Sequence, residues 1–429
     1  MEKGRAMRMN RRLAVGTLLV GAFALSACAS GGGQSSAEES DPNLTVWFMR
    51  GDVPDAAQEW LATEWAERND GAELTIEIQD WDGIVTKLQT SLASESQTPD
   101  VVEFGNTQVR TFTSVGALSD ISDLQEEIGG DALIPSLVEA GSIDETLYAA
   151  PFFAGSRVIF YRESMLEEAG IEVPETIDEL GDAAVALKEA NSDVANFEGI
   201  FTAAKDLGSN LGWLFTYGTP IAEQDGDQWV GTLSTPEGIE ALEALQRIYT
   251  EGMSTAATAT VDETRTPYVP YNEGRAAMFS SLPNAWDEIS PELQEDTGAF
   301  ALPGTDAGDI GHALAGGSNI GIAAASPNQE HSRELLAMMF EPEFQEYFAT
   351  EGGWVPGNTE YSVPAEGNPA AEAQVAAVEN SMMTPLAPGW GVIESNDVMR
   401  NLFTEVAQGG DVTALAEEYD AIITSLLNE

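Results

Sequence analysis

The chain has 429 residues and a formal net charge of −54, from 72 acidic and 18 basic side chains. This much negative charge repels phosphate backbones and anionic lipid, which argues against nucleic-acid binding, flat membrane binding and an anionic ligand. With one cysteine the chain has no internal disulfide, so its stability must come from packing, and its length favours two domains over one.

Residues 1–27 have the layout of a secretory signal peptide. Five basic residues in 3–12 precede an apolar run, Leu13 to Leu25, that is too short to span a membrane. The run ends at Leu25-Ser26-Ala27-Cys28, which resembles the bacterial lipobox, where the cysteine becomes residue one and carries lipid. We therefore expect a lipidated Cys28 followed by a flexible tether, residues 28–42; the alternative is a plain signal peptide with a chance cysteine.

After the tether, strand and helix patterns alternate. Strands are expected at Leu44–Phe48, Glu73–Gln79 and Asp100–Phe104, and helices at Pro54–Arg68 and Gly83–Ser94. This order predicts a parallel sheet with helices on both faces. Ligands of such sheets bind beyond the carboxyl ends of the strands, which are here Trp47 to Arg50, Gln79 to Trp81 and Gly105 to Gln108.

Residues 149–171 have the pattern of a crossing between two lobes. Pro151 keeps the residue before it extended, Gly155-Ser156 is a flexible joint, and Arg157–Tyr161 is a buried strand. The helix that follows ends at Gly170 in the left-handed conformation. A return crossing is expected at His312–Asn328, where the glycines suit a close backbone approach, Ile320–Ala324 is a strand, and Ser326-Pro327 caps a helix, 329–340.

The remaining pattern is mostly helical. Helices are expected at 132–140, 177–189, 206–216, 236–251, 343–350, 370–380, 392–407 and 412–427, with a short helix after Pro283 and a short strand at 274–279.

Taken in order, these segments resemble the group 1 extracellular solute-binding proteins, the maltose-binding-protein-like receptors of ABC sugar importers. The resemblance is carried by the lipobox, YAAPFFAGSRVIFYRESM, GRAAMFSSLPNAW and GGSNIGIAAASPN. One departure is Leu282-Pro283-Asn284, where the maltose-binding branch has Gly-Pro-Trp; here Trp286 follows two residues later.

The resemblance implies an α/β, two-lobe periplasmic-binding-protein-like fold of type II. Each lobe would be a mostly parallel sheet flanked by helices, with the ligand cleft between the lobes. We assign residues 43–153 and about 300–345 to the first lobe, and 154–299 and about 346–429 to the second.

Sugars offer hydroxyls and flat faces of C–H groups, so their sites combine aromatic platforms with planar polar side chains. Of the nine tryptophans, Trp60 and Trp65 lie on the core spacing of a helix, and Trp229 lies in a strand-like segment. The candidate ligand-binding residues are Trp47, Trp81, Asn106, Gln108, Arg157, Asn210, Trp213, Asn284, Trp286, Gly317, Ser318, Trp354 and Trp390.

Structural alternatives compete with several of these assignments. Trp47 and Trp213 would equally suit a buried core, and Asn106 could cap a helix. Arg157 could pair with a carboxylate, which the abundance of acidic residues slightly favours, and the glycines before Ser318 could form a bulge.

Two histidines and one cysteine give no metal-binding cluster, and no phosphate loop or nucleophile elbow is present, so we expect no metal, no cofactor and no enzymatic activity. The resemblance implies a lipid-anchored monomer on the extracytoplasmic face of the bacterial cell membrane. It would capture an oligosaccharide by hinge closure and deliver it to ABC permease subunits. Two alternatives stay open: a receptor of the same fold for a non-sugar solute, and a secreted carbohydrate-active enzyme with a catalytic carboxylate pair.

Overall fold

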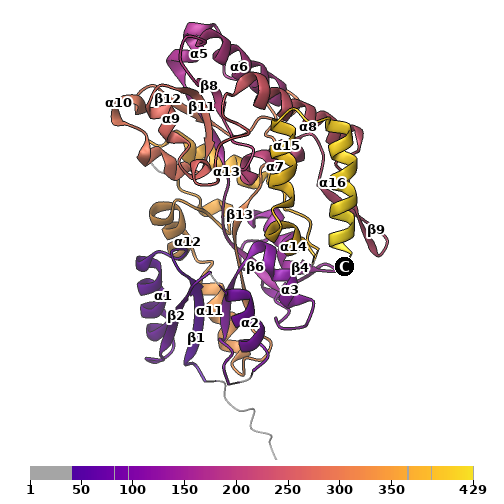
Figure 1. The fold of residues 1–429 in the computed structure, drawn as a ribbon. Helices are drawn as coiled ribbons and strands as arrows, with labels where there is room; N and C mark the ends of the chain where they lie inside the picture. Colours follow the sequence, from indigo (N-terminus) through magenta and orange to yellow (C-terminus); the bar gives the residue numbers. More distant parts are fainter. Residues whose placement is uncertain (1–40, 82, 95, 365–366, 388, 429) are drawn as a thin grey trace, which may run out of the picture. The chain divides into compact units, whose positions relative to one another are not determined.

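The computed structural model describes residues 41–428 apart from residues 82, 95, 365–366 and 388 (Figure 1). The predicted signal peptide, Cys28 and most of the tether therefore lie outside the described residues. Within the described part of the chain, no helix has both the length and the apolar character needed to cross a membrane.

A six-stranded sheet has the order β14-β6-β13-β3-β1-β2. Strands β1 (Leu44–Met49), β2 (Leu74–Gln79) and β3 (Val101–Gly105) run parallel, connected through helices α1 (Asp55–Arg68) and α2 (Ile84–Ser91), as predicted. The other three strands come from later in the chain and are β6 (Ala149–Gly155), β13 (Gly316–Ile322) and β14 (Val355–Pro356). Strand β13 runs antiparallel to both β3 and β6, and β14 runs antiparallel to β6.

A four-stranded sheet has the order β12-β7-β11-β8. Strand β7 (Val158–Arg162) runs antiparallel to β11 (Ala276–Ser281) and β12 (Thr297–Phe300), and only β8 (Glu198–Phe201) is parallel to its neighbour. The expectation of mostly parallel sheets is therefore wrong in this detail. Parallel neighbours within one sheet need a crossover connection. Strand β7 instead enters this sheet directly from β6 of the other sheet, after only Ser156 and Arg157.

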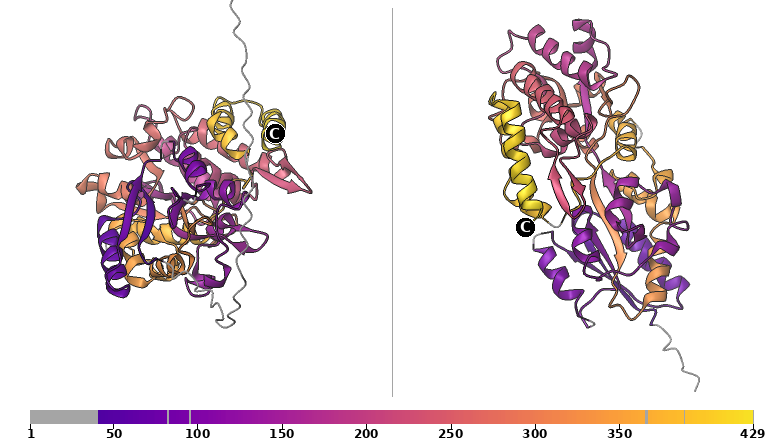
Figure 2. Two further views of the ribbon diagram at one scale, coloured as in Figure 1. Left: turned by 90° about the horizontal axis from the view of Figure 1, so that it is seen from below. Right: turned by 90° about the vertical axis from the view of Figure 1, so that its right-hand side faces the viewer.

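The four-stranded sheet shares one hydrophobic core with the helices in residues 163–247 and 390–427. Helix α16 (Val412–Leu427), yellow in the figures, packs along α8 (Pro236–Arg247), as Figure 2 shows. The other elements are α3 (Val109–Thr113), α4 (Pro135–Gly141), α5 (Glu163–Ala169), α6 (Ile177–Ala190), α7 (Leu207–Thr216), α9 (Tyr268–Asn272), α10 (Pro291–Gln294), α11 (Gln329–Met338), α12 (Pro342–Tyr347), α13 (Pro369–Glu379), α14 (Trp390–Ser395), α15 (Val398–Ala407), and the short strands β4 (Ser142–Ile143), β5 (Thr146–Leu147), β9 (Ala222–Asp225) and β10 (Gln228–Gly231).

Three local predictions need correction. Helix α8 ends at Arg247 and continues as a wider turn, Ile248–Gly252, and the helix expected at 392–407 is the pair α14 and α15. The cap position of α11 is Asn328 and not Ser326, whose hydroxyl donates to the carboxylate of Asp100 and accepts the Asn328 N–H at 3.1 Å.

The division into two lobes stays our proposal, and the contacts move one of its boundaries. Phe348 stacks on Phe153 of β6, with ring centroids 5.1 Å apart, and Val355 pairs with Ala154. The chain thus remains with the six-stranded sheet as far as Pro356. We therefore place the second boundary after Pro356 rather than near residue 346.

The pairing of β6 with β13 is unusually close. All seven residues of β6 are buried, and the register shifts between Ser318 and Asn319, so the bulge considered for this segment is present. Gly317 has φ +156°, and a Cβ there would lie 2.2 Å from the carbonyl oxygen of Phe153. At Gly316 the nearest atom to such a Cβ is 4.0 Å away. Only glycine permits this approach at position 317.

We expect Gly317→Ala to lower the free energy of unfolding by about 2 kcal/mol or more, because the methyl group must displace backbone and the φ value is strained for alanine. Gly316→Ala is the matched control and should change it by less than about 1 kcal/mol. Urea unfolding of both variants measures this. An equal loss in the two variants would contradict the role given to the close approach.

Candidate functional site

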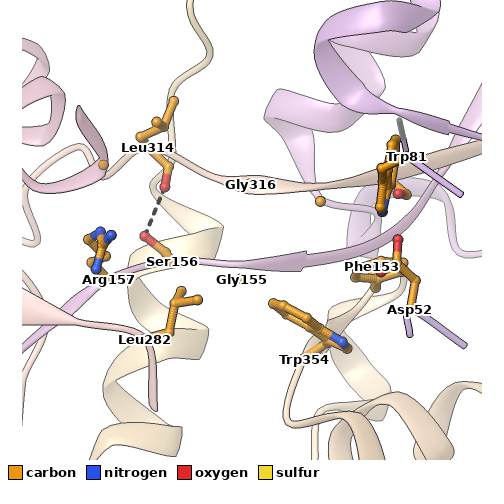
Figure 3. A pocket seen from close by; sticks show the side chains of 13 residues that line it. Asp52, Trp81, Phe153, Gly155, Ser156, Arg157, Leu282, Leu314, Gly316 and Trp354 are labelled. Carbon is orange, nitrogen blue, oxygen red and sulfur yellow. Dashed lines mark hydrogen bonds between the residues drawn. The ribbon is translucent and has the colours of Figure 1, made fainter. Parts of the chain in front are cut away.

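A cavity of about 310 Å³ lies where β6 passes from the six-stranded sheet toward β7 (Figure 3). Its lining comes from the six-stranded sheet, from residues that adjoin β7 and β11, and from α7. Five of the thirteen predicted ligand-binding residues line it, namely Trp81, Arg157, Gly317, Ser318 and Trp354. The other lining residues are Asp52, Phe153, Gly155, Ser156, Gly208, Leu282, Leu314 and Gly316.

Two indole rings provide flat apolar surface in this cavity. Trp81 follows β2 and is 39% exposed, with its ring against Gly105, where a Cβ would lie 3.3 Å from the ring. Trp354 packs on Phe153, with ring centroids 5.3 Å apart, and lies over Gly155 (Figure 3). A Cβ at Gly155 would lie 2.7 Å from the Trp354 ring, so this glycine determines where the ring can lie.

Ser156 and Arg157 of the crossing line the cavity with polar side chains. The Ser156 hydroxyl donates to the carbonyl oxygen of Leu314 at 3.2 Å, which joins the two crossing segments (dashed in Figure 3). Beside it, the Arg157 guanidinium pairs with Asp206 at 3.0 Å. Arg157 thus combines both interpretations of the sequence, because it pairs with a carboxylate and also lines the cavity.

Asp52 and Glu103 form an acidic corner that the sequence analysis missed. Asp52 lies in the loop after β1 and lines the cavity; Glu103 lies in β3, is fully buried, and accepts the Met49 N–H at Oε2, at 2.8 Å. Burial raises the pKa of Glu103 well above its usual value, and the neighbouring Asp52 raises it further. Burial also raises the pKa of Asp52, against the lowering effect of interactions with Glu103 and Trp81.

Two signals in the sequence could have found this pair. Glu103 stands between Val102 and Phe104 in a strand whose other side chains are apolar, and such a carboxyl must be buried. Asp52 lies two residues after Arg50, where the predicted ligand-facing end of the first strand stops, in the same loop.

Several other candidates lie nearby. Asn284 and Trp286 line a second cavity, of about 350 Å³, and Trp354 lines both cavities. Trp213 is 2% exposed and shares a small pocket of about 20 Å³ with Arg157. The Gln108 side chain, like the Trp81 ring, lies against Gly105.

The remaining four candidates line neither of these two cavities. Trp47 is 5% exposed, with Lys87 over its ring, and Trp390 is buried in α14, where its Nε1–H donates to Glu394. The side-chain amides of Asn106 and Asn210 donate to backbone carbonyl oxygens, of Ala315 at 3.0 Å and of Ala203 at 3.0 Å. Each of these polar groups is used within the protein, and Asn106 does not cap a helix.

In the described part of the chain, no group of three or more His, Cys, Asp or Glu side chains could hold a metal ion. The cavity is lined by two indole rings, one paired guanidinium, the carboxyl group of Asp52, two serines and the glycine-rich backbone of the crossings.

Residues 50–346 match the family described as bacterial extracellular solute-binding proteins. The chain is 31% identical over 384 residues to the diacetylchitobiose binding protein DasA of Streptomyces coelicolor, covering 88% of each chain. Its fold is similar to that of the sugar-binding protein MalE of Xanthomonas citri (TM-score 0.77, 21% identity, covering 90% of this chain and 97% of that one). It is also similar to a Staphylococcus aureus solute-binding protein in complex with maltose (TM-score 0.75, 16% identity, covering 90% and 97%). The structure has a mixed α/β fold, and the matches in sequence cover most of the chain. The chain therefore belongs to the bacterial extracellular solute-binding protein family.

Proposed function

We propose that this protein captures an uncharged oligosaccharide, a disaccharide or short oligomer, and delivers it to an ABC importer. The observation that carries this proposal is the cavity in which Trp81 and Trp354 supply flat apolar faces beside the polar groups of Asp52 and Arg157. Sugars match this combination, because each ring presents C–H faces to stack on indoles and hydroxyls to exchange hydrogen bonds. The volume of about 310 Å³ lies in the usual range of ligand pockets, about 300–1,000 Å³.

The relatives support a sugar as the ligand class. DasA is named for binding diacetylchitobiose, and the similar structures include a maltose complex. N,N′-diacetylchitobiose is therefore the first ligand to test, with maltose as the second. A receptor for a non-sugar solute of the same fold is the alternative, and a shift in melting temperature with such a solute but with no sugar would favour it.

Hinge closure is the proposed mechanism of capture. One side of the cavity is lined by Arg157, just before β7, and by Gly208 of α7; the other side is lined by residues of the six-stranded sheet. Only Ser156 and Arg157 connect β6 to β7, so this connection is a short hinge. A ligand that contacts both sides binds the closed arrangement more tightly and shifts the population toward it. We propose that one chain suffices, so that the protein acts as a monomer.

The enzyme alternative finds little support in the acidic corner. A glycosidase needs two carboxyl groups that flank the bond to be cleaved, at least about 5 Å apart. Asp52 and Glu103 instead interact with each other, and Glu103 is fully buried. Incubation with labelled oligosaccharides tests this point, and turnover would favour the enzyme.

We also propose that Cys28 is lipidated and anchors the protein to the extracytoplasmic face of the membrane. Acyl chains contribute about 0.8 kcal/mol per buried methylene group, so more than one chain gives stable attachment. Cys28→Ser should abolish incorporation of labelled palmitate and release the protein into the soluble fraction. Release of the unsubstituted protein, with no label, would contradict the anchor.

We expect Trp81→Ala and Trp354→Ala each to raise the Kd for N,N′-diacetylchitobiose by about ten- to hundredfold, because an aromatic platform contributes about 1–3 kcal/mol. Trp229→Ala is the matched control, since Trp229 lies in β10 and lines neither of the two cavities. Isothermal titration calorimetry measures the affinities, and unfolding curves confirm that each variant is folded. Unchanged affinity in both indole variants would refute the stacking role.

A further inference from the structure

The acidic corner combines a carboxyl group on the cavity surface with one directly behind it. Asp52 lines the cavity, and Glu103 is 0% exposed. In β3 the side chain of Glu103 alternates with those of Val102 and Phe104, which belong to the hydrophobic core on the opposite face. Glu103 is therefore held by its strand and cannot turn toward solvent.

Two buried polar atoms of this corner have no hydrogen bond of ordinary geometry among the described residues, although the Ser318 hydroxyl interacts with the Glu103 carboxyl group. They are Oε1 of Glu103 and Oγ of Ser318, and Ser318, which is also 0% exposed, lines the cavity. Buried polar atoms without well-formed hydrogen bonds are costly. A proton on Glu103 would let its carboxyl group donate to Asp52, the carboxyl group of the pair that lines the cavity.

No described cation forms an ion pair with either carboxyl group. Around the corner, Arg50 of the same loop is paired with Asp80 of the neighbouring loop, and Arg157 is paired with Asp206. Lys87 of α2 donates to Gln79 and lies over the Trp47 ring. From β1 only the Met49 N–H reaches Glu103, and Trp81 and Ser318 are neutral. Two negative charges side by side in this desolvated place would repel without compensation.

We propose that Asp52 and Glu103 hold one proton between them at neutral pH, and that ligand binding to the cavity is linked to keeping this proton. The inference rests on the proposed function and deepens it. With one proton the pair presents an acceptor at Asp52, on the cavity surface. This acceptor fits a hydroxyl or acetamido N–H group of a neutral sugar and disfavours an anionic ligand.

The direction of the linkage follows from desolvation. A ligand that fills the cavity removes the remaining water from Asp52, so the complex holds the shared proton more tightly than the free protein does. Where the free pair begins to lose its proton, binding must take one up, and the affinity then falls by up to about tenfold per pH unit as pH rises.

The first test is calorimetric titration of N,N′-diacetylchitobiose in two buffers of different ionisation enthalpy, from about pH 6 to about pH 9. The unsubstituted protein should take up protons on binding at the alkaline end and bind more weakly there. Glu103→Gln keeps the shape and an N–H donor but cannot titrate, so its proton uptake should vanish and its affinity should be independent of pH. Glu77→Gln is the matched control, with the same change of charge at an exposed position of β2, and should behave like the unsubstituted protein.

The second test needs no ligand, and so separates this inference from the proposed function. A carboxyl group whose pKa is raised on folding stabilises the protein fully below its unfolded value, about 4.3, and this stability is lost as pH rises through the raised pKa. The free energy of unfolding in urea of the unsubstituted protein, minus that of Glu103→Gln, should therefore fall as pH rises. Glu77→Gln should show the same fall relative to Glu103→Gln.

The outcomes are distinct. Proton uptake that persists in Glu103→Gln, or a stability difference that does not change with pH, overturns the shared proton. If no sugar binds at any pH, the proposed function fails together with the ligand linkage, and the urea series alone decides whether the pair holds a proton.

Discussion

The close backbone pairing of β6 with β13 is the constraint on which the rest of the structure depends. It requires glycine at position 317, where a side chain would meet the Phe153 carbonyl oxygen at 2.2 Å. Because β6 runs almost directly into β7, the same pairing fixes where the two sheets meet and places Gly155, Ser156 and Ser318 along the cavity. Position 155 must likewise be small, since the Trp354 ring lies over it. The positions of the side chains in the site thus depend on this backbone pairing.

Charge around the site is arranged to cancel. The chain carries a formal net charge of −54, yet the cation on the cavity wall, Arg157, is neutralised by Asp206. In the acidic corner, burial favours the protonated, neutral form of Glu103, so the corner does not carry two negative charges. A cavity without an unpaired cation suits neutral ligands, which agrees with the proposed sugar and with the expectation drawn from the composition of the chain.

Sequence patterns were sufficient for most of the fold and for part of the site. The β1–α1–β2–α2–β3 order and the Gly170 stop were confirmed, because helical spacing and glycine conformation are local properties. The antiparallel entry of β7 and β13 could not be predicted in this way, since strand direction there depends on where the chain comes from, which no local pattern records. The family resemblance was also confirmed, and it supplied what spacing alone could not.

Within the site, the residues that the patterns found are those whose surroundings are unusual in sequence. Trp81 and Trp354 stand beside Asp or Gly in loops, and both line the cavity. Trp390 has similar neighbours in sequence but is buried in the core that contains the last helix. Local composition does not distinguish a loop that packs against the core from a loop that lines a cavity. Asp52 and Glu103 were missed for the opposite reason: in a chain with 72 acidic residues, a carboxyl group stands out only when its burial is known.

Trp354 has one further consequence. Its ring forms a partition, with the cavity of Trp81 on one side and that of Asn284 and Trp286 on the other. Because one indole borders both cavities, the proposed saccharide would meet this ring at the end of either one. Substitution at this single position would therefore change the space offered to a ligand without altering either sheet.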